Sequence, residues 1–244
     1  MRRRFFVDQV RNGKAELSGD DAKHLTRVLR VEAGQRFEIS DNHSVYLAEI
    51  EIARKECVVF RTLEKLEPLP RPGVRLVLCA ALIKFDRFEW MIEKATELGV
   101  SEIVPVEAFR SERGLERAAR KRVERWRRIA LEASQQSRRA ILPVVHGPVG
   151  WRDAVGVSAE NRYALDESPD VPGLAAGTRP SEASSSIAIL VGPEGGWTDE
   201  ERESFGAAGW IAVSLGPLIL RAETAAIAAL AIANVFAAKI AIEK

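Results

Sequence analysis

The sequence predicts an α/β protein in which a small β-rich domain precedes a larger domain built on a parallel sheet. Alternating apolar and polar residues, typical of half-buried strands, dominate the first part of the chain. Residues 66–73 contain three prolines and have the composition of a stiff linker. Beyond them, strand-like and helical segments alternate. We therefore expect two domains, 1–69 and 73–244.

The first domain is predicted to hold strands around a single helix. The alternation over Arg36–Ser40 and Val45–Ile50 indicates two half-buried strands. A helix is expected only at Asp20–Leu29.

The second domain is predicted to open with a βαβ unit. Leu76–Ile83 is an apolar strand, and Asp86 with Glu89 three residues later matches a capping box for the next helix. Gly99 is placed to end that helix, and Ile103–Val106 gives the next strand. Two strands joined through a helix imply a parallel sheet.

The rest of the second domain continues this alternation. Residues 168–186, rich in Ser, Pro and Gly, are expected to form a flexible surface connection. The other expected elements are a long basic helix at Leu115–Arg139, strands at Ile141–Val145, Tyr163–Leu165, Ile187–Val191 and Ile211–Leu215, and helices at Thr198–Ala208 and Ala225–Ala238.

Composition excludes several classes of protein. With 46% hydrophobic and 29% charged residues, the chain is an ordinary globular one. The longest apolar stretch, 225–238, is too short to cross a bilayer, and no export signal is evident, so we expect a cytoplasmic protein without a membrane partner. Two separated cysteines and three scattered histidines predict free thiols and no metal site.

Positive charge is concentrated in two segments although the net charge is only +1. Residues 110–139 carry eleven Lys/Arg against four Glu, and residues 2–36 carry nine against five Asp/Glu. This asymmetry fits a surface that faces a polyanion, but also a solvated helix face.

Two loops have the composition of a ligand site. Gly192–Trp197 follows a predicted strand and precedes a helix, where ligands of open α/β sheets bind. Its spacing matches neither the dinucleotide nor the phosphate-loop motif, and a structural tight turn is the alternative. Leu215–Ala225 also joins a strand to a helix. There Leu218–Leu220 could bury an apolar ring such as adenine, whereas Glu223 and Thr224 could equally cap the helix.

Several motifs in order resemble the RsmE family of the SPOUT superfamily, bacterial methyltransferases that act on the N-3 position of a uridine in 16S ribosomal RNA. Besides the two loops, the resemblance rests on residues 81–89, 93–100, 111–113 and 132–139. Residues 4–7 and 24–31 look like that family's PUA-like RNA-binding domain. The resemblance covers nearly the whole chain.

The resemblance implies a PUA-like β-barrel domain followed by a trefoil-knotted parallel-sheet domain, which general rules of chain connection would not predict. It also implies S-adenosyl-L-methionine as cofactor, 16S ribosomal RNA as substrate, within the small ribosomal subunit, and a homodimer. The Ala-rich last helix could form the dimer interface or simply pack in the core. By carry-over, the donor-binding residues are Leu190, Gly192, Glu194, Gly195, Leu215, Leu220 and Thr224.

Chemistry suggests roles for the remaining site residues. Methylation at uridine N-3 needs a proton acceptor and a cation that stabilises charge on the uracil oxygens. Arg221 is the candidate cation, and Glu223 could orient it or accept the proton, with Glu194 as a weaker candidate. RNA phosphates are expected to contact Arg2, Arg3, Arg4, Lys23, Arg27, Arg30, Arg113 and Arg138.

Two positions depart from the family pattern. Leu218 replaces an arginine that usually precedes Ile-Leu-Arg, and Gln135 replaces a common glutamate. If either lost group contacts RNA, affinity or base choice would differ. Three alternatives remain at this point: a related enzyme acting on transfer RNA, a non-catalytic ribosome-assembly factor, and a small-molecule α/β enzyme.

Overall fold

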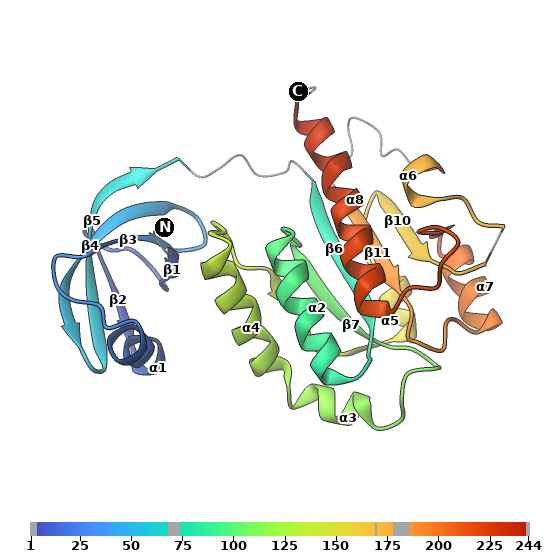
Figure 1. The fold of residues 1–244 in the computed structure, drawn as a ribbon, viewed down its shortest axis with the longest axis horizontal. Helices are drawn as coiled ribbons and strands as arrows, with labels where there is room; N and C mark the ends of the chain where they lie inside the picture. Colours follow the sequence, from blue (N-terminus) through green and yellow to red (C-terminus); the bar gives the residue numbers. More distant parts are fainter. Residues whose placement is uncertain (1–3, 68–73, 169, 178–185, 243–244) are drawn as a thin grey trace. The chain divides into compact units, whose positions relative to one another are not determined.

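The structure, a computed structural model, describes residues 4–67, 74–168, 170–177 and 186–242 (Figure 1). Two compact units make up the chain. The first contains Met1–Pro70 and Ser134–Leu142, and the second contains Arg71–Ala133 and Pro143–Lys244. Residues 68–73 of the predicted linker lie outside the described residues.

The first unit is built on a mixed, curved five-stranded sheet in the order β1-β3-β4-β5-β2. β1 and β3 are parallel, and the other neighbours are antiparallel. Its apolar face includes Phe5, Ile39, Ile50 and Phe60, all at most 1% exposed. The strands are β1 Arg4–Phe6, β2 Lys14–Ser18, β3 Arg36–Ser40, β4 Val45–Arg54 and β5 Cys57–Leu66.

The single helix expected in this unit is confirmed but is not uniform. It consists of α1, Gly19–Lys23, and a π-helical turn η1, His24–Val28. Leu25 points into the core and is 2% exposed. π-Helical turns often occur at functional sites.

Residues 134–142 belong to this unit through a buried ionic contact. Arg4 is 5% exposed, donates to Glu38 Oε2 at 2.7 Å and donates to the Arg138 carbonyl oxygen. Arg138 also pairs with Glu38. The hydroxyl of Ser40 donates to the carbonyl oxygen of Ala140. Glu38 thus holds the guanidinium groups of Arg4 and Arg138, which are 134 residues apart in the sequence.

The second unit contains a seven-stranded parallel sheet, as the βαβ pattern predicted. The order is β12-β10-β11-β6-β7-β8, with β9 also pairing with β7. The strands are β6 Arg75–Ala81, β7 Glu102–Glu107, β8 Val144–Val145, β9 Val149–Gly150, β10 Asn161–Leu165, β11 Ser186–Val191 and β12 Ile211–Val213.

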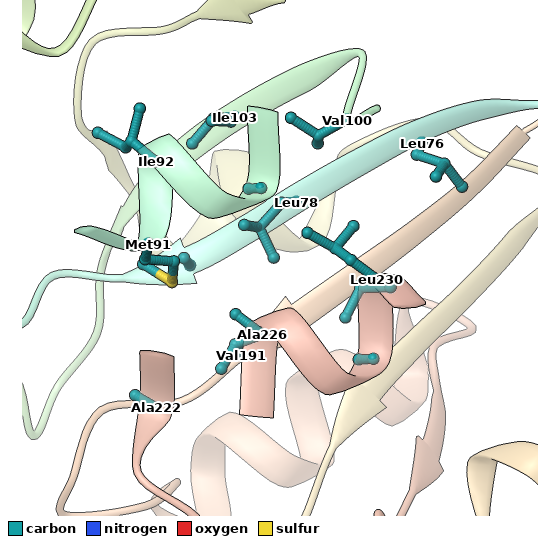
Figure 2. Packing of buried hydrophobic residues seen from close by; sticks show 14 of the residues in the cluster. Leu76, Leu78, Met91, Ile92, Val100, Ile103, Val191, Ala222, Ala226 and Leu230 are labelled. Carbon is teal, nitrogen blue, oxygen red and sulfur yellow. The ribbon is translucent and has the colours of Figure 1, made fainter. Parts of the chain in front are cut away.

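Helices cover both faces of this sheet, because successive residues of each strand point to opposite sides. Leu76 and Leu78 of β6 face one core, while Val77 and Cys79 face the other. The first core is shared with helices α2 Phe85–Glu97, α4 Val123–Gln136 and α8 Ala222–Ile242, and Figure 2 shows side chains from α2, α8 and the central strands gathered in it. The second core is covered by α5 Trp151–Val155 and α7 Asp199–Ala207.

Two predicted helix boundaries are wrong. α2 begins at Phe85 with Lys84 as its N-cap, so Asp86 is no cap. Glu89 instead accepts hydrogen bonds from Arg122 and Arg125. The long helix expected over 115–139 is broken at residues 121–122 into α3, Leu115–Arg120, and α4.

Two predictions about helix ends are confirmed, whereas two predictions about other segments hold only in part. Gly99, at φ +83°, follows the end of α2, and Thr198 with Glu201 forms the capping box of α7. The expected strand at 141–145 is reduced to β8. Part of the connection 168–186 forms the short helix α6, Leu174–Gly177, and the rest includes residues outside those described.

Both cysteines are free thiols, as expected, and burial raises the pKa of Cys79 to about 12. Across the described part of the chain, no helix has the length and apolar character to traverse a membrane.

Candidate active site

The main pocket lies at the carboxyl end of the parallel sheet, where three loops follow β10, β11 and β12. Its walls come from residues 165–167, 191–194, 196–197, 214–216, 218–220 and 222, with Arg202 and Ala225 from the adjoining helices. The open space between these walls is about 670 Å³, including the part open to solvent. Both loops that the sequence singled out therefore contribute to one pocket.

The loop after β11 needs glycine at its first position. A Cβ at Gly192 would lie 3.0 Å from the Trp197 ring. That ring is 1% exposed, and its Nε1 donates to the Leu165 carbonyl oxygen at 2.8 Å, so it cannot easily move. Gly192 thus lets the loop lie flat against the indole, and both residues line the pocket.

The next two glycines are constrained by side chains from other loops. A Cβ at Gly195 would lie 3.1 Å from Arg110 Cβ, and Arg110 Nη1 donates to the Gly195 carbonyl oxygen at 2.9 Å. Gly196 has a φ of +67°, and a Cβ there would lie 2.9 Å from Glu167 Oε1. The conformation of this glycine loop is therefore fixed by contacts on both sides.

The loop after β12 exposes apolar side chains at the pocket. Leu218 is 78% exposed, Ile219 is 84% exposed and Leu220 is 37% exposed, and all three line the pocket. Large apolar side chains clustered on a pocket wall gain free energy when an apolar ligand group covers them. The run Leu218–Leu220 therefore forms an apolar wall of the pocket.

The start of α8 presents one exposed cation and one buried anion. Arg221 is exposed and makes no side-chain ion pair with any residue that the structure describes. Glu223 is 7% exposed, and its Oε2 is buried without a hydrogen-bond partner. Its Oε1 lies 3.8 Å from Arg87 Nε, whereas Arg87 Nη1 donates to Glu194 Oε1 at 2.9 Å. Arg87, rather than Arg221, is the cation beside Glu223.

Asp166 and Arg202, which both line the pocket, form an ion pair. Arg202 Nε donates to Asp166 Oδ2 at 2.8 Å, and the Ser168 hydroxyl donates to Asp166 Oδ1 at 2.6 Å. Burial of Asp166 by itself would raise the pKa of this carboxyl, but the hydrogen bonds from Arg202 and Ser168 outweigh it and lower the pKa. Asp166 is therefore a fixed negative charge at the pocket.

The structure brings together four of the seven predicted donor contacts in the pocket lining. They are Gly192, Glu194, Leu215 and Leu220. The others do not line it: the Leu190 side chain is fully buried against the second core, Gly195 contacts Arg110, and Thr224 is exposed on α8.

Two features of the site were not predicted from the sequence: the acidic residues Asp166 and Glu167, and Arg87, which contacts two carboxylates. Asp166, Glu167 and Arg202 line the pocket, and Arg87 contacts both candidate carboxylates. One signal was available for Asp166 and Glu167, since they directly follow a predicted strand at the edge of the sheet where ligands bind.

The predicted RNA contacts differ in accessibility. Arg27, Arg30 and Arg113 are exposed, while Lys23 pairs with Asp20 at 3.0 Å. Arg138 is half-buried against Glu38, and Arg4 is buried in the same ion pair, so its guanidinium is engaged inside the protein. Arg2 and Arg3 lie outside the described residues. No group of three potential metal ligands occurs within the described ranges.

Comparison with known proteins gives matches over most of the chain. A family model described as an RNA methyltransferase domain matches residues 70–234, and one described as an RNA methyltransferase PUA domain matches residues 17–60. The ribosomal RNA small subunit methyltransferase E of Synechocystis is 34% identical, covering 93% of this chain and 75% of that protein. The Mycobacterium tuberculosis protein of the same name is 31% identical, covering 96% and 92%.

Solved structures agree with these matches. The ribosomal RNA small subunit methyltransferase E of Neisseria gonorrhoeae, bound to S-adenosyl methionine, superposes with a TM-score of 0.87 at 28% identity, covering 96% of this chain and 98% of that one. A methyltransferase from Legionella pneumophila with bound cofactor superposes with a TM-score of 0.86 at 28% identity, covering 98% of each chain.

Proposed function

The chain belongs to the family of ribosomal RNA small subunit methyltransferase E, and on that premise we propose that it methylates the N-3 position of a specific uridine in 16S ribosomal RNA, with S-adenosyl-L-methionine as methyl donor. The observation that carries this proposal is the pocket between the loops after β10, β11 and β12.

The residues of this pocket fit the methyl donor. Exposed Leu218 and Ile219 provide an apolar wall for the adenine ring, and the glycine loop leaves backbone groups accessible. The carboxylates of Asp166, Glu167 and Glu194 suit the hydroxyl groups and the positive charges of S-adenosylmethionine. When bound, this molecule supplies a methyl group attached to a positively charged sulfur. The sulfur leaves readily, because it becomes a neutral thioether.

The reaction requires loss of the N-3 proton of uridine. The N-3 lone pair forms the new bond to the methyl carbon, the carbon–sulfur bond breaks, and the proton passes to a base. Because negative charge spreads onto the uracil oxygens, a nearby cation lowers the barrier. Exposed Arg221 carries such a charge with no internal partner among the described residues.

Glu223 remains the stronger candidate for the base, and Glu194 the weaker. Glu223 Oε2 is buried and unpartnered, as expected of an atom that accepts a hydrogen bond only when substrate is present. Arg87 lies on the side of Oε1 and leaves Oε2 available. Glu194 is already hydrogen-bonded to Arg87 at 2.9 Å.

Phosphate contacts are assigned to exposed cations. In the first unit these are Arg27 and Arg30, with Lys23 beside Asp20, and in the second unit Arg113. Arg2 and Arg3 stay in the proposal on sequence grounds, and Arg138 stays as a half-buried cation. Arg4 is better explained as a structural residue, because its guanidinium is occupied by Glu38.

Three further features complete the proposal: a trefoil knot, a homodimer and a cytoplasmic location. The knot rests on membership of the family, and the loops after β11 and β12 that would take part in it border one pocket. Dimerisation rests on membership of the family: Ala226, Ala229 and Ala233 of α8 pack in the core, and exposed Val235 is left for a contact between copies. A ribosomal RNA substrate within the small subunit fits the cytoplasm of a bacterium.

The proposal is tested by incubating the protein with methyl-labelled S-adenosylmethionine and either small ribosomal subunits that lack the modification or bulk transfer RNA, then digesting the RNA to nucleosides. Labelled 3-methyluridine is the expected product. A different labelled nucleoside, or label only on transfer RNA, would overturn the assignment of base or substrate. Absence of donor binding and of label would indicate an assembly factor instead.

A further inference from the structure

Phe109, in the loop after β7, is 83% exposed. The next most exposed aromatic side chain in the described residues is Trp90, at 44%. A single exposed apolar residue needs no explanation in itself. Two further observations distinguish Phe109: a buried carboxylate fixes its backbone, and the next residue contacts the glycine loop of the pocket.

The Phe109 backbone is fixed by a buried carboxylate. Its N–H donates at 2.8 Å to Oε1 of Glu201, which is 4% exposed and whose Oε2 accepts from the Thr198 N–H in the capping box of α7. A turn follows at once, in which the Ser111 N–H donates to the Ala108 carbonyl oxygen at 3.1 Å. The ring is therefore held outward on a rigid support rather than on a loose loop.

The neighbouring residue joins this turn to the pocket. Arg110 donates to the Gly195 carbonyl oxygen at 2.9 Å and packs against that glycine. Gly192, Glu194 and Gly196 of the same glycine loop line the pocket. Phe109 is thus displayed directly beside the loop that borders the proposed site of methyl transfer.

The surroundings of Phe109 are positively charged. Residues 109–122 contain six Lys/Arg and two Glu, a net charge of 6 − 2 = +4. Arg110 and Arg113 are exposed like the ring itself. An aromatic ring among exposed guanidinium groups is the combination that binds unpaired nucleotides, because bases stack on the ring and cations contact the phosphates.

We propose that Phe109 stacks on a base of the RNA substrate, either the target uridine or a nucleotide next to it, and holds the RNA against the methyl-transfer pocket. This inference rests on the proposed function. A second copy of this chain is the other possible occupant, and the net charge of +4 disfavours it, because a two-fold contact would bring equal positive charges together.

Three variants test this proposal: Phe109→Ala, Phe109→Tyr, which keeps an aromatic ring, and Trp90→Ala as a matched exposed aromatic on α2. Binding to unmethylated small ribosomal subunits is measured by filter retention without methyl donor. KM and kcat for methylation, donor Kd and sedimentation behaviour are measured in parallel. The binding assay needs no catalysis, so it decides the role of Phe109 even if wild-type protein binds the subunits but produces no 3-methyluridine.

We expect Phe109→Ala to weaken subunit binding and to raise KM by about 5- to 150-fold, the usual effect of losing one base stack. Donor Kd and sedimentation should stay unchanged, and Phe109→Tyr and Trp90→Ala should behave like wild type. Equal binding by Phe109→Ala and Trp90→Ala would overturn the proposal. So would a change in oligomeric state in Phe109→Ala, which would assign the ring to an interface between copies.

Discussion

Arg221 and Glu223, at the start of α8, lie in opposite environments, and this difference suggests that they have different roles in the reaction. Arg221 is exposed and available to substrate, whereas Glu223 is 7% exposed with one unpartnered oxygen. Arg87 occupies the other side of Glu223. Methyl transfer to a uridine nitrogen requires a cation that can contact the substrate. It also requires a nearby anion in a fixed position.

Replacing Arg221 with alanine should separate donor binding from chemistry. Loss of one preorganised charge contact is expected to lower the rate of methylation by about 10²- to 10³-fold. Donor affinity should remain near the wild-type value, because Arg221 does not line the pocket. Single-turnover kinetics and calorimetric titration with S-adenosylmethionine measure the two effects. A wild-type rate in this variant would remove Arg221 from the mechanism.

Glycine at position 192 should be required for the donor pocket. In Gly192→Ala the new Cβ meets the buried Trp197 ring at 3.0 Å, so the loop or the ring must shift. We expect donor Kd to rise at least about tenfold, a loss of about 1.4 kcal/mol. Gly206→Ala is the matched control, since a Cβ there meets nothing within 4 Å. Equal donor Kd in both variants would show that binding of the methyl donor does not depend on the conformation of this loop.

At the scale of elements, the Asp166–Arg202 ion pair ties the end of β10 to α7. The pKa of Asp166 is lowered in the folded protein, so the pair stabilises the fold above the ordinary aspartate pKa near 3.8. This stabilisation is lost as pH falls through 3.8 toward the lower pKa of the folded state.

Asp166→Asn should therefore reduce the free energy of unfolding by about 1.5–3 kcal/mol at pH 7. The difference from wild type should shrink progressively below about pH 4. Urea unfolding at several pH values measures this difference in the free energy of unfolding. A difference that stays constant down to pH 2 would mean that the charge of Asp166 contributes nothing.

Elements were predictable from sequence where the signal is local. The capping box of Thr198 and Glu201 formed as expected, because both partners lie within one turn. Asp86 and Glu89 have the same spacing, but Glu89 is engaged by Arg122 and Arg125 from a segment more than thirty residues away. When a distant residue competes with the local one for the same hydrogen bond, the spacing of residues in the sequence does not reveal it. The same holds for the break at residues 121–122, where no glycine or proline marks the end of α3.

The site was predictable in part for the same reason. The two loops after β11 and β12 were identified because glycines and charged residues follow apolar strands directly. Arg87 was not assigned a role, because its relation to Glu194 and Glu223 depends on three separate segments meeting. The buried position of Arg4 was not predictable, because the sequence cannot show that Glu38 and Arg138 contact its guanidinium.

At the scale of the whole molecule, the uneven charge predicted from sequence is partly neutralised by internal ion pairs. Arg122 and Arg125 pair with Glu89, Arg127 with Glu124 and Arg128 with Glu132. Fewer cations are therefore left for RNA than the sequence count of residues 110–139 implies.

Binding to small ribosomal subunits should weaken linearly in a plot of log K against log salt concentration. Each phosphate contact contributes a slope of about −0.7 to −0.9. Removing one contact in Arg27→Ala should make the slope shallower by about that amount. Arg128→Ala is the control, since its guanidinium is already paired with Glu132 at 3.2 Å. Equal slopes for Arg27→Ala and wild type would exclude Arg27 from the phosphate contacts.

We propose that this chain, acting through the pocket of the second unit, produces 3-methyluridine in small-subunit ribosomal RNA. The most direct test is to express it in a bacterium that lacks its own enzyme of this family and to quantify the nucleosides of purified 16S ribosomal RNA by mass spectrometry. Wild-type protein should restore 3-methyluridine, and Arg221→Ala at the same protein level should not. Well-expressed wild-type protein that leaves the RNA without 3-methyluridine would contradict the proposed function.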